Sequence, residues 1–564
     1  MKRVELNMET VPVRRSELLM PAGSLERLKV GVLYGADAIY LGTPDMSMRT
    51  KSQFSLEDIK EGISFAHERN VRVYLTLNIF THNKDIPKLD AYIETLKDVR
   101  PDGVIVSDPG VFHYLREHAP EFNIHISTQA NVCSWMTVKF WKDQGAELIV
   151  LAREVTFSEL EEIREKCTDV RLETFVHGAM CMTYSGRCLL SNFMAERGAN
   201  QGNCANSCRW QYKVHLRLND GTIKELELSE ENMKLFEFVL EEGHRPGDLM
   251  PIEEDDRGSY ILNSKDLCLM PKLDDYLRIG VDSLKVEGRG KSPYYLATTA
   301  RAYRRAIDAY YEDPENWDHR PYMRELEMTG NRGYTLAFHD GRVTNYGHNY
   351  ENTNSIAAWE FGGIVRELNQ DALVIEIKNK LRSGDVLEFI PPNPKDAPVL
   401  LRLYEFDVEG KDEPQEAIHG GPKCRIRIPF TAFDRESPEE MLRKFPEFTV
   451  VRKESLLTEE AWERIRLDQL TQKIELGRSS PERYSIAVER LKSTISDETR
   501  EKRARTSSRG LEGCCGRGCN GCLMFWNDPK YEAARALMAD KKSGEMLTKN
   551  MRDDVIEARA AIGA

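Results

Sequence analysis

The stretch ELIVLAREVTFSELEEIREKCTDVRLETFVH (147–177) contains one complete strand–helix–strand unit. Its two ends, ELIVLAR (147–153) and RLETFVH (171–177), are short runs with the β-branched and aromatic residues that favour strands. Between them, FSELEEIREK (157–166) has the apolar spacing of an amphipathic helix. Parallel strands need a crossover connection of this kind, so the stretch predicts a parallel α/β fold.

The same pattern recurs on both sides of this stretch. Further strand-like runs lie at 17–20, 37–41, 71–78, 103–107, 123–127, 260–264 and 282–288, and helical patterns lie at 56–70, 85–99, 136–145 and 292–313. Eight or nine such units in about 300 residues suit a TIM-like (β/α) barrel better than an open sheet. In such barrels the functional groups gather at the carboxyl ends of the strands.

The rest of the chain predicts two further domains. LVIEIKNKLRSGDVLEFI (373–390) and KCRIRIPF (423–430) alternate with a period of two, with a Ser-Gly-Asp turn, which indicates a small β-barrel or sandwich. Residues 211–258 form an acidic insertion that we expect to be solvated. The expected domains are the barrel at 1–330, a small β-domain at 331–453, and a helical, cysteine-containing extension at 454–564.

Composition limits the class of protein. The chain has 564 residues, 41% of them hydrophobic, and its formal net charge is −13. No apolar run approaches the roughly 18 residues that a membrane helix needs, and MKRVELNMETVPVRRSEL (1–18) lacks the apolar core of a secretory signal. We therefore expect a cytoplasmic protein without a membrane partner. The negative charge argues against general nucleic-acid binding, although a local basic patch can still bind RNA.

Four cysteines lie in residues 171–210, which we call the cysteine segment. Four thiolates are what an iron–sulfur cluster or a structural zinc ion requires. Twelve cysteines in a cytoplasmic chain favour metal ligation over disulfides, and small polar neighbours argue against ordinary buried cysteines. The lack of a close Cys-x-x-Cys pair favours iron–sulfur, with 4Fe–4S as the expected type. The candidate ligands are Cys181, Cys188, Cys204 and Cys208, with Cys268 as a substitute for Cys208.

A second cysteine group lies in CCGRGCNGC (514–522), close to the end of the sequence. Its glycines and its Cys-x-x-Cys end are typical of metal sites, and zinc and a second iron–sulfur cluster remain equally open. The letters GRGCNG (516–521) also match a dinucleotide-binding motif, but they follow a basic linker (500–510) instead of a strand. The expected ligands are Cys514, Cys515, Cys519 and Cys522.

Several runs together carry a family resemblance. FVHGAMCMTYSGRCLLS (175–191), NQGNCANSCRW (200–210), YGADAIYLG (34–42) and SLKVEGRGKSPYY (283–295) resemble the collagenase-like peptidase family U32. The resemblance is strongest to its branch of prephenate-dependent tRNA 5-hydroxyuridine synthases and covers about residues 15–450. It implies hydroxylation of the wobble uridine (position 34) of tRNA, with prephenate as co-substrate. We expect tRNA, prephenate and an electron donor as partners.

Three other functions remain open. The first is a 23S rRNA cytidine hydroxylase of the same family. The second is a collagenase-like peptidase, although the sequence has neither H-E-x-x-H nor G-x-S-x-G, and a Cys181–His177 dyad is its remaining candidate. The third is a non-enzymatic, metal-bound partner of another hydroxylase.

Candidate site residues follow from this chemistry. The two carboxylates of prephenate favour cations near strand ends, above all arginine, which binds carboxylate through two parallel hydrogen bonds. Hydroxyl and amide groups that end the fifth strand can bind substrate. The expected substrate-binding residues are Arg49, Ser127, Thr128, Arg153, Lys285 and Arg289, and the expected catalytic residues are Gln129, Glu173, His177 and Glu287.

Phosphate contacts are expected from two basic stretches. Arg301, Arg304 and Arg305 lie at helical spacing in 292–313, and the linker 500–510 is rich in arginine. Both are candidates for binding the RNA backbone.

Overall fold

The structure is a computed structural model. It describes residues 15–43, 54–79, 81–181, 264–341, 359–369, 371–403, 406–433 and 437–454, together with short pieces between 183 and 260. The chain divides into two compact units, Met1–Glu512 and Gly513–Ala564. Arg49, Cys204, the basic linker, the 514–522 cysteines and the predicted helices after residue 454 lie outside the described residues.

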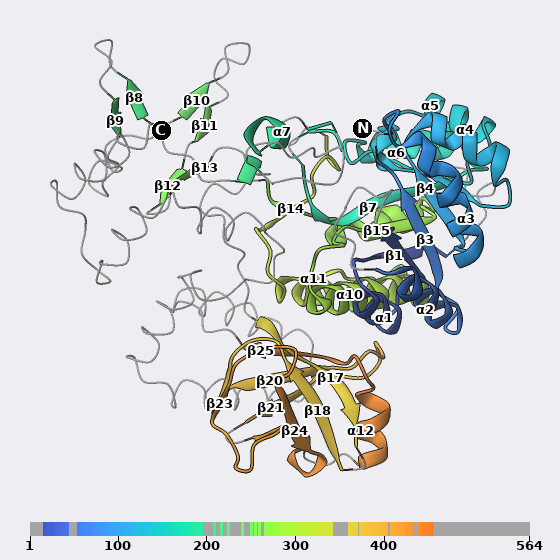
Figure 1. Cartoon of the computed structure of the whole chain (residues 1–564). Coiled ribbons are helices and arrows are strands. Elements are labelled where there is room, and N and C mark those ends of the chain that lie inside the picture. The colour runs from blue at the N-terminus through green and yellow to red at the C-terminus, as the bar shows by residue number, and fades with distance from the viewer. Residues whose placement is uncertain are drawn as a thin grey trace. The chain divides into compact units, whose positions relative to one another are not determined.

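Eight parallel strands close into a barrel, which confirms the predicted TIM-like fold (Figure 1). The last strand pairs with both β7 and β1, and these two pairings close the sheet. The barrel strands are β1 (Glu17–Ala22), β2 (Ala38–Gly42), β3 (Arg72–Leu77), β4 (Gly103–Val106), β5 (Ile124–Ile126), β6 (Leu148–Val150), β7 (Arg171–Ala179) and β15 (Ser283–Val286).

Helices between these strands cover the outside of the barrel (Figure 1). Their starts follow from the sequence: Ser55 and Thr156 each form a capping box, and Asp108 accepts from two backbone N–H groups of the first turn. Between the first seven strands these helices are α1 (Leu25–Leu33), α2 (Leu56–His67), α3 (Leu89–Val99), α4 (Pro109–His118), α5 (Trp135–Asp143) and α6 (Phe157–Lys166). α10 (Pro293–Glu312) follows the last strand.

The predicted strand at 260–264 is wrong as a barrel strand. β13 (Gly258–Tyr260) instead pairs with β12 (Glu253–Asp255), and the next strand, β14 (Asp266–Cys268), runs antiparallel to the end of β7. The physical reason is the closure of the barrel. Because β15 pairs with both β7 and β1, no strand edge between them is left for a ninth parallel strand. Cys268 therefore lies beside the barrel, opposite His177 in the register.

A second, antiparallel sheet follows the barrel. Its order is β21-β20-β25-β17-β18-β24-β22, and its inward side chains form a separate apolar core that includes Leu373, Ile375 and Phe389. Gly384, at φ +85°, makes the predicted turn. The strands are β17 (Trp359–Leu368), β18 (Ala372–Ile377), β20 (Val386–Ile390), β21 (Val399–Arg402), β22 (Asp407–Val408), β24 (Arg425–Pro429) and β25 (Val450–Glu454).

The boundary between the two sheets differs from the one expected at residue 331. β16 (Tyr334–Thr335) pairs with β14, so it belongs to the barrel sheet. Among the described residues, no helix combines the length and the hydrophobicity that crossing a membrane requires.

Candidate active site at the barrel mouth

The carboxyl ends of the barrel strands, which we call the mouth, carry a ring of polar side chains. Thr76 lies at the end of β3, Asn78 directly follows that strand, and Arg153 follows β6. Ser127 caps the short 3-10 helix Thr128–Ala130 after β5, and its hydroxyl accepts from the Gln129 N–H. Lys285 and Arg289 lie on β15 and in the loop behind it.

Three of the predicted cations meet at this mouth. The Arg153 guanidinium carbon lies 3.8 Å from the Phe175 ring centroid, and its Nη1 donates to Ser185 Oγ at 2.6 Å. Arg289 Nη1 donates to Thr76 Oγ1 at 2.9 Å. Lys285 Nζ lies 5.6 Å from the centroid of the same Phe175 ring, and both Lys285 Nζ and the Arg289 guanidinium carbon lie near the Tyr40 ring centroid, at 4.5 and 5.9 Å, so the three cations share two aromatic neighbours. Burial lowers the pKa of Lys285, and its ion pair with Glu173 opposes this.

Lys285 is the deepest of the three. Its Nζ donates to Glu173 Oε1 at 2.6 Å and lies 4.5 Å from the centroid of the Tyr40 ring. Both members of this ion pair are buried, with Glu173 at 0% and Lys285 at 5% exposure. Glu173 is thus placed as the partner of Lys285 inside the barrel.

The polar run after β5 divides into two kinds of residue. Thr128 Oγ1 donates to the Leu151 carbonyl at 3.3 Å, and Ser127 Oγ lies 3.4 Å from Asn78 Nδ2, so both take part in hydrogen bonds within the barrel. Gln129 is 6% exposed, and within the described part of the chain its Oε1 has no hydrogen-bond partner. A buried amide oxygen without a donor is costly, so Gln129 is the member of this run that a ligand would satisfy.

His177 and Glu287 lie side by side at the ends of β7 and β15. The Glu287 N–H donates to the His177 carbonyl at 2.8 Å, and Gly178 (φ +120°) allows this approach because a Cβ there would lie 2.7 Å from Glu287 Cβ. His177 is 1% exposed, and its Nδ1 lies 3.5 Å from the Tyr303 hydroxyl. Burial lowers the pKa of His177 to about 4, so the imidazole is neutral at pH 7.

The cysteine segment is attached to the mouth by hydrogen bonds. Arg187 Nε donates to Asn131 Oδ1 at 2.9 Å, and Asn131 Nδ2 donates to the Ser185 carbonyl at 3.5 Å. Together with the Arg153–Ser185 bond, these contacts join the segment to the loops after β5 and β6. Ser185, which belongs to the cysteine segment, therefore lies beside Arg153 at the mouth.

The donor chemistry of the segment fits a thiolate-bound cluster. Cys181 is exposed, and Cys188 and Cys208 are partly exposed. Within the described part of the chain, no three Cys, His, Asp or Glu side chains are gathered as metal ligands, and Cys204 lies outside that part. The complete ligand set stays a prediction.

Cys268 is a poor substitute ligand. It is 1% exposed, and its Sγ lies 3.9 Å from the Tyr303 hydroxyl and 3.7 Å from Met323 Sδ. Burial raises the pKa of its thiol to about 12, which disfavours the thiolate that a metal needs.

The phosphate contacts predicted on α10 are wrong for its two buried arginines. Arg301 is 1% exposed and donates to the carbonyls of Asn393 and Asp396 at 3.2 and 2.7 Å. Arg304 is 8% exposed and donates to Asp37 at 2.8 Å. Helical spacing correctly places these side chains near one another, but both are used inside the protein.

Sequence reasoning missed four mouth residues, namely Tyr40, Thr76, Asn78 and Ser185. The signal for two of them was present. VRVYLTLN (71–78) places a threonine and an asparagine two residues apart at the end of an apolar strand, so both point into the barrel. The contacts of Tyr40 and Ser185 depend on residues distant in sequence, which no local pattern reveals.

Known proteins resemble this chain over most of its described part. The model of peptidase family U32 matches residues 23–349. A protein of Escherichia coli (strain K12) named tRNA hydroxylation protein P is 40% identical over 67% of this chain and 86% of its own length. tRNA hydroxylation protein P1 of Bacillus subtilis (strain 168) is 36% identical over 69% of this chain and 86% of its own. The 23S rRNA 5-hydroxycytidine C2501 synthase of Escherichia coli (strain K12) is 29% identical over 68% of this chain and 53% of its own.

Proposed function

The chain belongs to peptidase family U32, and on this premise we propose that it is an RNA hydroxylase that acts on tRNA. The proposed product is 5-hydroxyuridine at the wobble position, and the proposed co-substrate is prephenate. The observation that carries the proposal is the grouping of Arg153, Lys285 and Arg289 around the Tyr40 and Phe175 rings, with Arg153 hydrogen-bonded to Ser185 of the cysteine segment. The relatives named for tRNA hydroxylation, at 36 and 40% identity, support the choice of RNA.

The mouth suits a small ligand with two carboxylates. The planar guanidinium groups of Arg153 and Arg289 can each hold one carboxylate through two parallel hydrogen bonds. Both now donate to neutral hydroxyl groups, of Ser185 and Thr76, which a carboxylate can replace. The Lys285 ammonium below them adds a third positive charge.

The RNA base must enter the same mouth. C5 of a pyrimidine is out of reach in a stacked helix, so the nucleotide has to be unstacked, as RNA-modifying enzymes generally require. The Gln129 amide is a candidate for hydrogen bonding to the edge of that base. Replacing C5–H by C5–OH adds one oxygen atom and is a two-electron oxidation of the base. The reaction therefore needs either an oxygen-atom donor or, if water supplies the oxygen, a two-electron acceptor that takes up the two electrons while two protons are released.

An iron–sulfur cluster, held by Cys181, Cys188, Cys204 and Cys208, would supply electron transfer at this point. The roles of the described residues do not depend on its geometry. Arg153 and Arg289 bind and orient the anion, and Glu173 holds the Lys285 ammonium group in place at the base of the mouth.

The peptidase alternative is less well supported. A cysteine nucleophile needs a histidine that can take its proton. Cys181 is exposed, whereas His177 is 1% exposed and its pKa lies at about 4. The rRNA alternative is favoured by the 29% identity to the 23S rRNA synthase and is kept as a second candidate.

Reconstitution separates these functions. The chain, purified without oxygen, would be incubated with prephenate and unmodified tRNA or 23S rRNA, and the nucleosides analysed by mass spectrometry. We expect 5-hydroxyuridine in tRNA, a strong loss of product in Arg153→Ala, and full activity in Arg425→Ala, a matched arginine on β24. Product in rRNA alone would favour the second candidate, product only with an added protein would favour the partner role, and peptide cleavage alone would favour the peptidase.

Metal analysis tests the cofactor separately. Iron and sulfide would be measured in the wild type, in a Cys181→Ala, Cys188→Ala double variant, and in Cys268→Ala. We expect the iron and sulfide of the first cluster to be lost in the double variant, so that both contents fall by one cluster per chain, and to be kept in Cys268→Ala, because Cys268 is buried against Tyr303 and Met323. A wild type without iron after anaerobic reconstitution would overturn the cluster proposal.

A further inference from the structure

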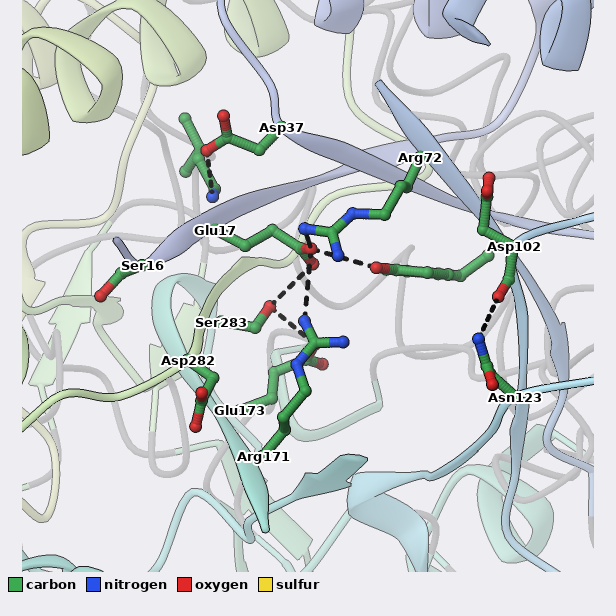
Figure 2. Close-up of polar contacts among 12 residues, drawn as sticks. Ser16, Glu17, Asp37, Arg72, Asp102, Asn123, Arg171, Glu173, Asp282 and Ser283 are labelled. Atoms are coloured by element: carbon green, nitrogen blue, oxygen red, sulfur yellow. Dashed lines mark hydrogen bonds and ion pairs between the residues drawn. The ribbon is translucent and has the colours of Figure 1, made fainter. Parts of the chain in front are cut away.

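A buried polar column runs through the barrel below the mouth. At its lower end Glu17, on β1, is 2% exposed and is approached by Arg72 and Arg171, as Figure 2 shows. The Arg171 Nη2 atom lies 3.6 Å from Glu17 Oε2, and the Tyr74 hydroxyl donates to the same oxygen at 3.0 Å. One carboxyl group at the amino end of the barrel is thus fixed by two guanidinium groups and a phenol.

Ser283 connects this end to the mouth. Its Oγ lies 3.3 Å from Glu17 Oε1 and 2.9 Å from Glu173 Oε2 (Figure 2). The other oxygen of Glu173 accepts from Lys285 Nζ at 2.6 Å. The sheet register explains the column, because Ser283 is paired with Glu17 on one side and with Glu173 on the other, and Lys285 follows two residues later on the same inward face.

The hydroxyl of Ser283 has one proton, so it can donate to only one of the two carboxyl groups. The shorter distance selects Glu173. Donation to Oε2 fixes the rotation of the Glu173 carboxylate and leaves Oε1 for Lys285. Glu17 does not depend on that proton, since Tyr74 already donates to it and Arg72 and Arg171 form ion pairs with it.

We propose that Ser283 is a positioning residue, which holds Glu173 in the orientation that keeps Lys285 as an ammonium ion at the base of the mouth. Lys285 needs this support because its surroundings favour the neutral amine. Its Nζ is buried, and Arg153 and Arg289 add positive charge from above. The other groups near it are the rings of Tyr40 and Phe175 and, deeper in the barrel, His125, Arg72, Arg171, Tyr74 and Glu17.

This inference rests on the proposed function only for the identity of the ligand that Lys285 binds. The protonation of Lys285 can be tested in the absence of RNA and co-substrate. The full chain would be labelled with a trace of acetic anhydride at a series of pH values, and Lys285 acetylation would be measured by peptide mass spectrometry. Only the neutral amine reacts, so the midpoint of the labelling curve follows the pKa of Lys285.

We expect the Lys285 midpoint to fall by about one pH unit or more in Glu173→Gln, which removes the opposite charge. Ser283→Ala is expected to lower it by a smaller amount, and Ser283→Thr, which keeps the hydroxyl, to restore it. Ser16→Ala is the matched control, because Ser16 is a buried serine beside Glu17 whose Oγ donates to the Val281 carbonyl at 2.6 Å.

Three outcomes would overturn the proposal. They are an unchanged midpoint in Ser283→Ala, an equal shift in Ser16→Ala, and a Lys285 that stays unreactive even in Glu173→Gln. Circular dichroism spectra of all variants show whether a shift reflects general loss of structure, and the Ser283→Thr rescue provides the same check at the residue itself. Because labelling needs no substrate, a chain that fails to hydroxylate RNA can still support or refute the role of Ser283.

Discussion

The two ends of the barrel use charged residues in different ways. At the amino end, charges are paired with each other: Glu17 with Arg72 and Arg171, and Arg164 with Asp282 at 2.6 Å. At the mouth, Arg153 donates to a neutral hydroxyl, and Gln129 Oε1 has no partner among the described residues. Groups whose partners are supplied by the fold stabilise it, whereas groups that lack a full set of partners are suited to a ligand.

The largest expected effect is at the amino end. Glu17→Ala should reduce the free energy of unfolding by about 3 kcal/mol at pH 7, because it leaves two guanidinium groups without their shared carboxylate. Arg72 is 44% exposed and can turn to water, which keeps the loss at the lower end of the range for buried pairs. Urea unfolding of the wild type and of Glu17→Ala measures this change in the free energy of unfolding. Glu68→Ala, which breaks the exposed pair with Arg69, should cost less than about 0.5 kcal/mol.

At the mouth, replacing a charged side chain by alanine should weaken ligand binding more than it lowers the free energy of unfolding. Arg153→Ala should weaken prephenate binding by about 2 kcal/mol, roughly 30-fold, because a charged hydrogen bond to the ligand is lost. Its free energy of unfolding should change by less than about 1 kcal/mol. Calorimetric titration and urea unfolding of the same variant measure the two quantities. If stability falls by as much as in Glu17→Ala, the proposed difference between the two ends is incorrect.

A smaller effect comes from His125, inside the barrel. It is 1% exposed, and burial, followed by the charges of Arg171, Lys285 and Arg72, holds the pKa of its imidazole well below 6.5. Below pH 6.5 the imidazole of His125 is protonated in the unfolded chain but stays neutral in the folded chain. The free energy of unfolding therefore falls as the pH falls. The wild type should lose about 1 kcal/mol from this source by pH 5.5. Urea unfolding at pH 7.5, 6.5 and 5.5 should show a flatter profile for His125→Phe, and parallel profiles would contradict this role.

Predictions that depend only on local pattern are confirmed by the structure. The strand and helix periods of ELIVLAREVTFSELEEIREK (147–166) appear in the structure as β6 and α6, and Arg153 and Arg289 occupy the mouth because each follows a strand. Local pattern failed for Arg301. Helical spacing predicts which residues share a face of the helix, but not which part of the protein covers that face. Here Arg301 is covered by residues near Asn393, whose carbonyl accepts a hydrogen bond from it.

The repeated strand–helix pattern by itself determined a parallel α/β barrel and the placing of polar groups at its mouth, because periodicity and capping act between neighbouring residues. Only the tertiary structure decided that eight strands close the barrel and which charges pair inside it. Those pairings join residues distant in sequence, such as Ser283 and Glu173, which are 110 positions apart. Their geometry depends on the register of closure, which no local stretch contains.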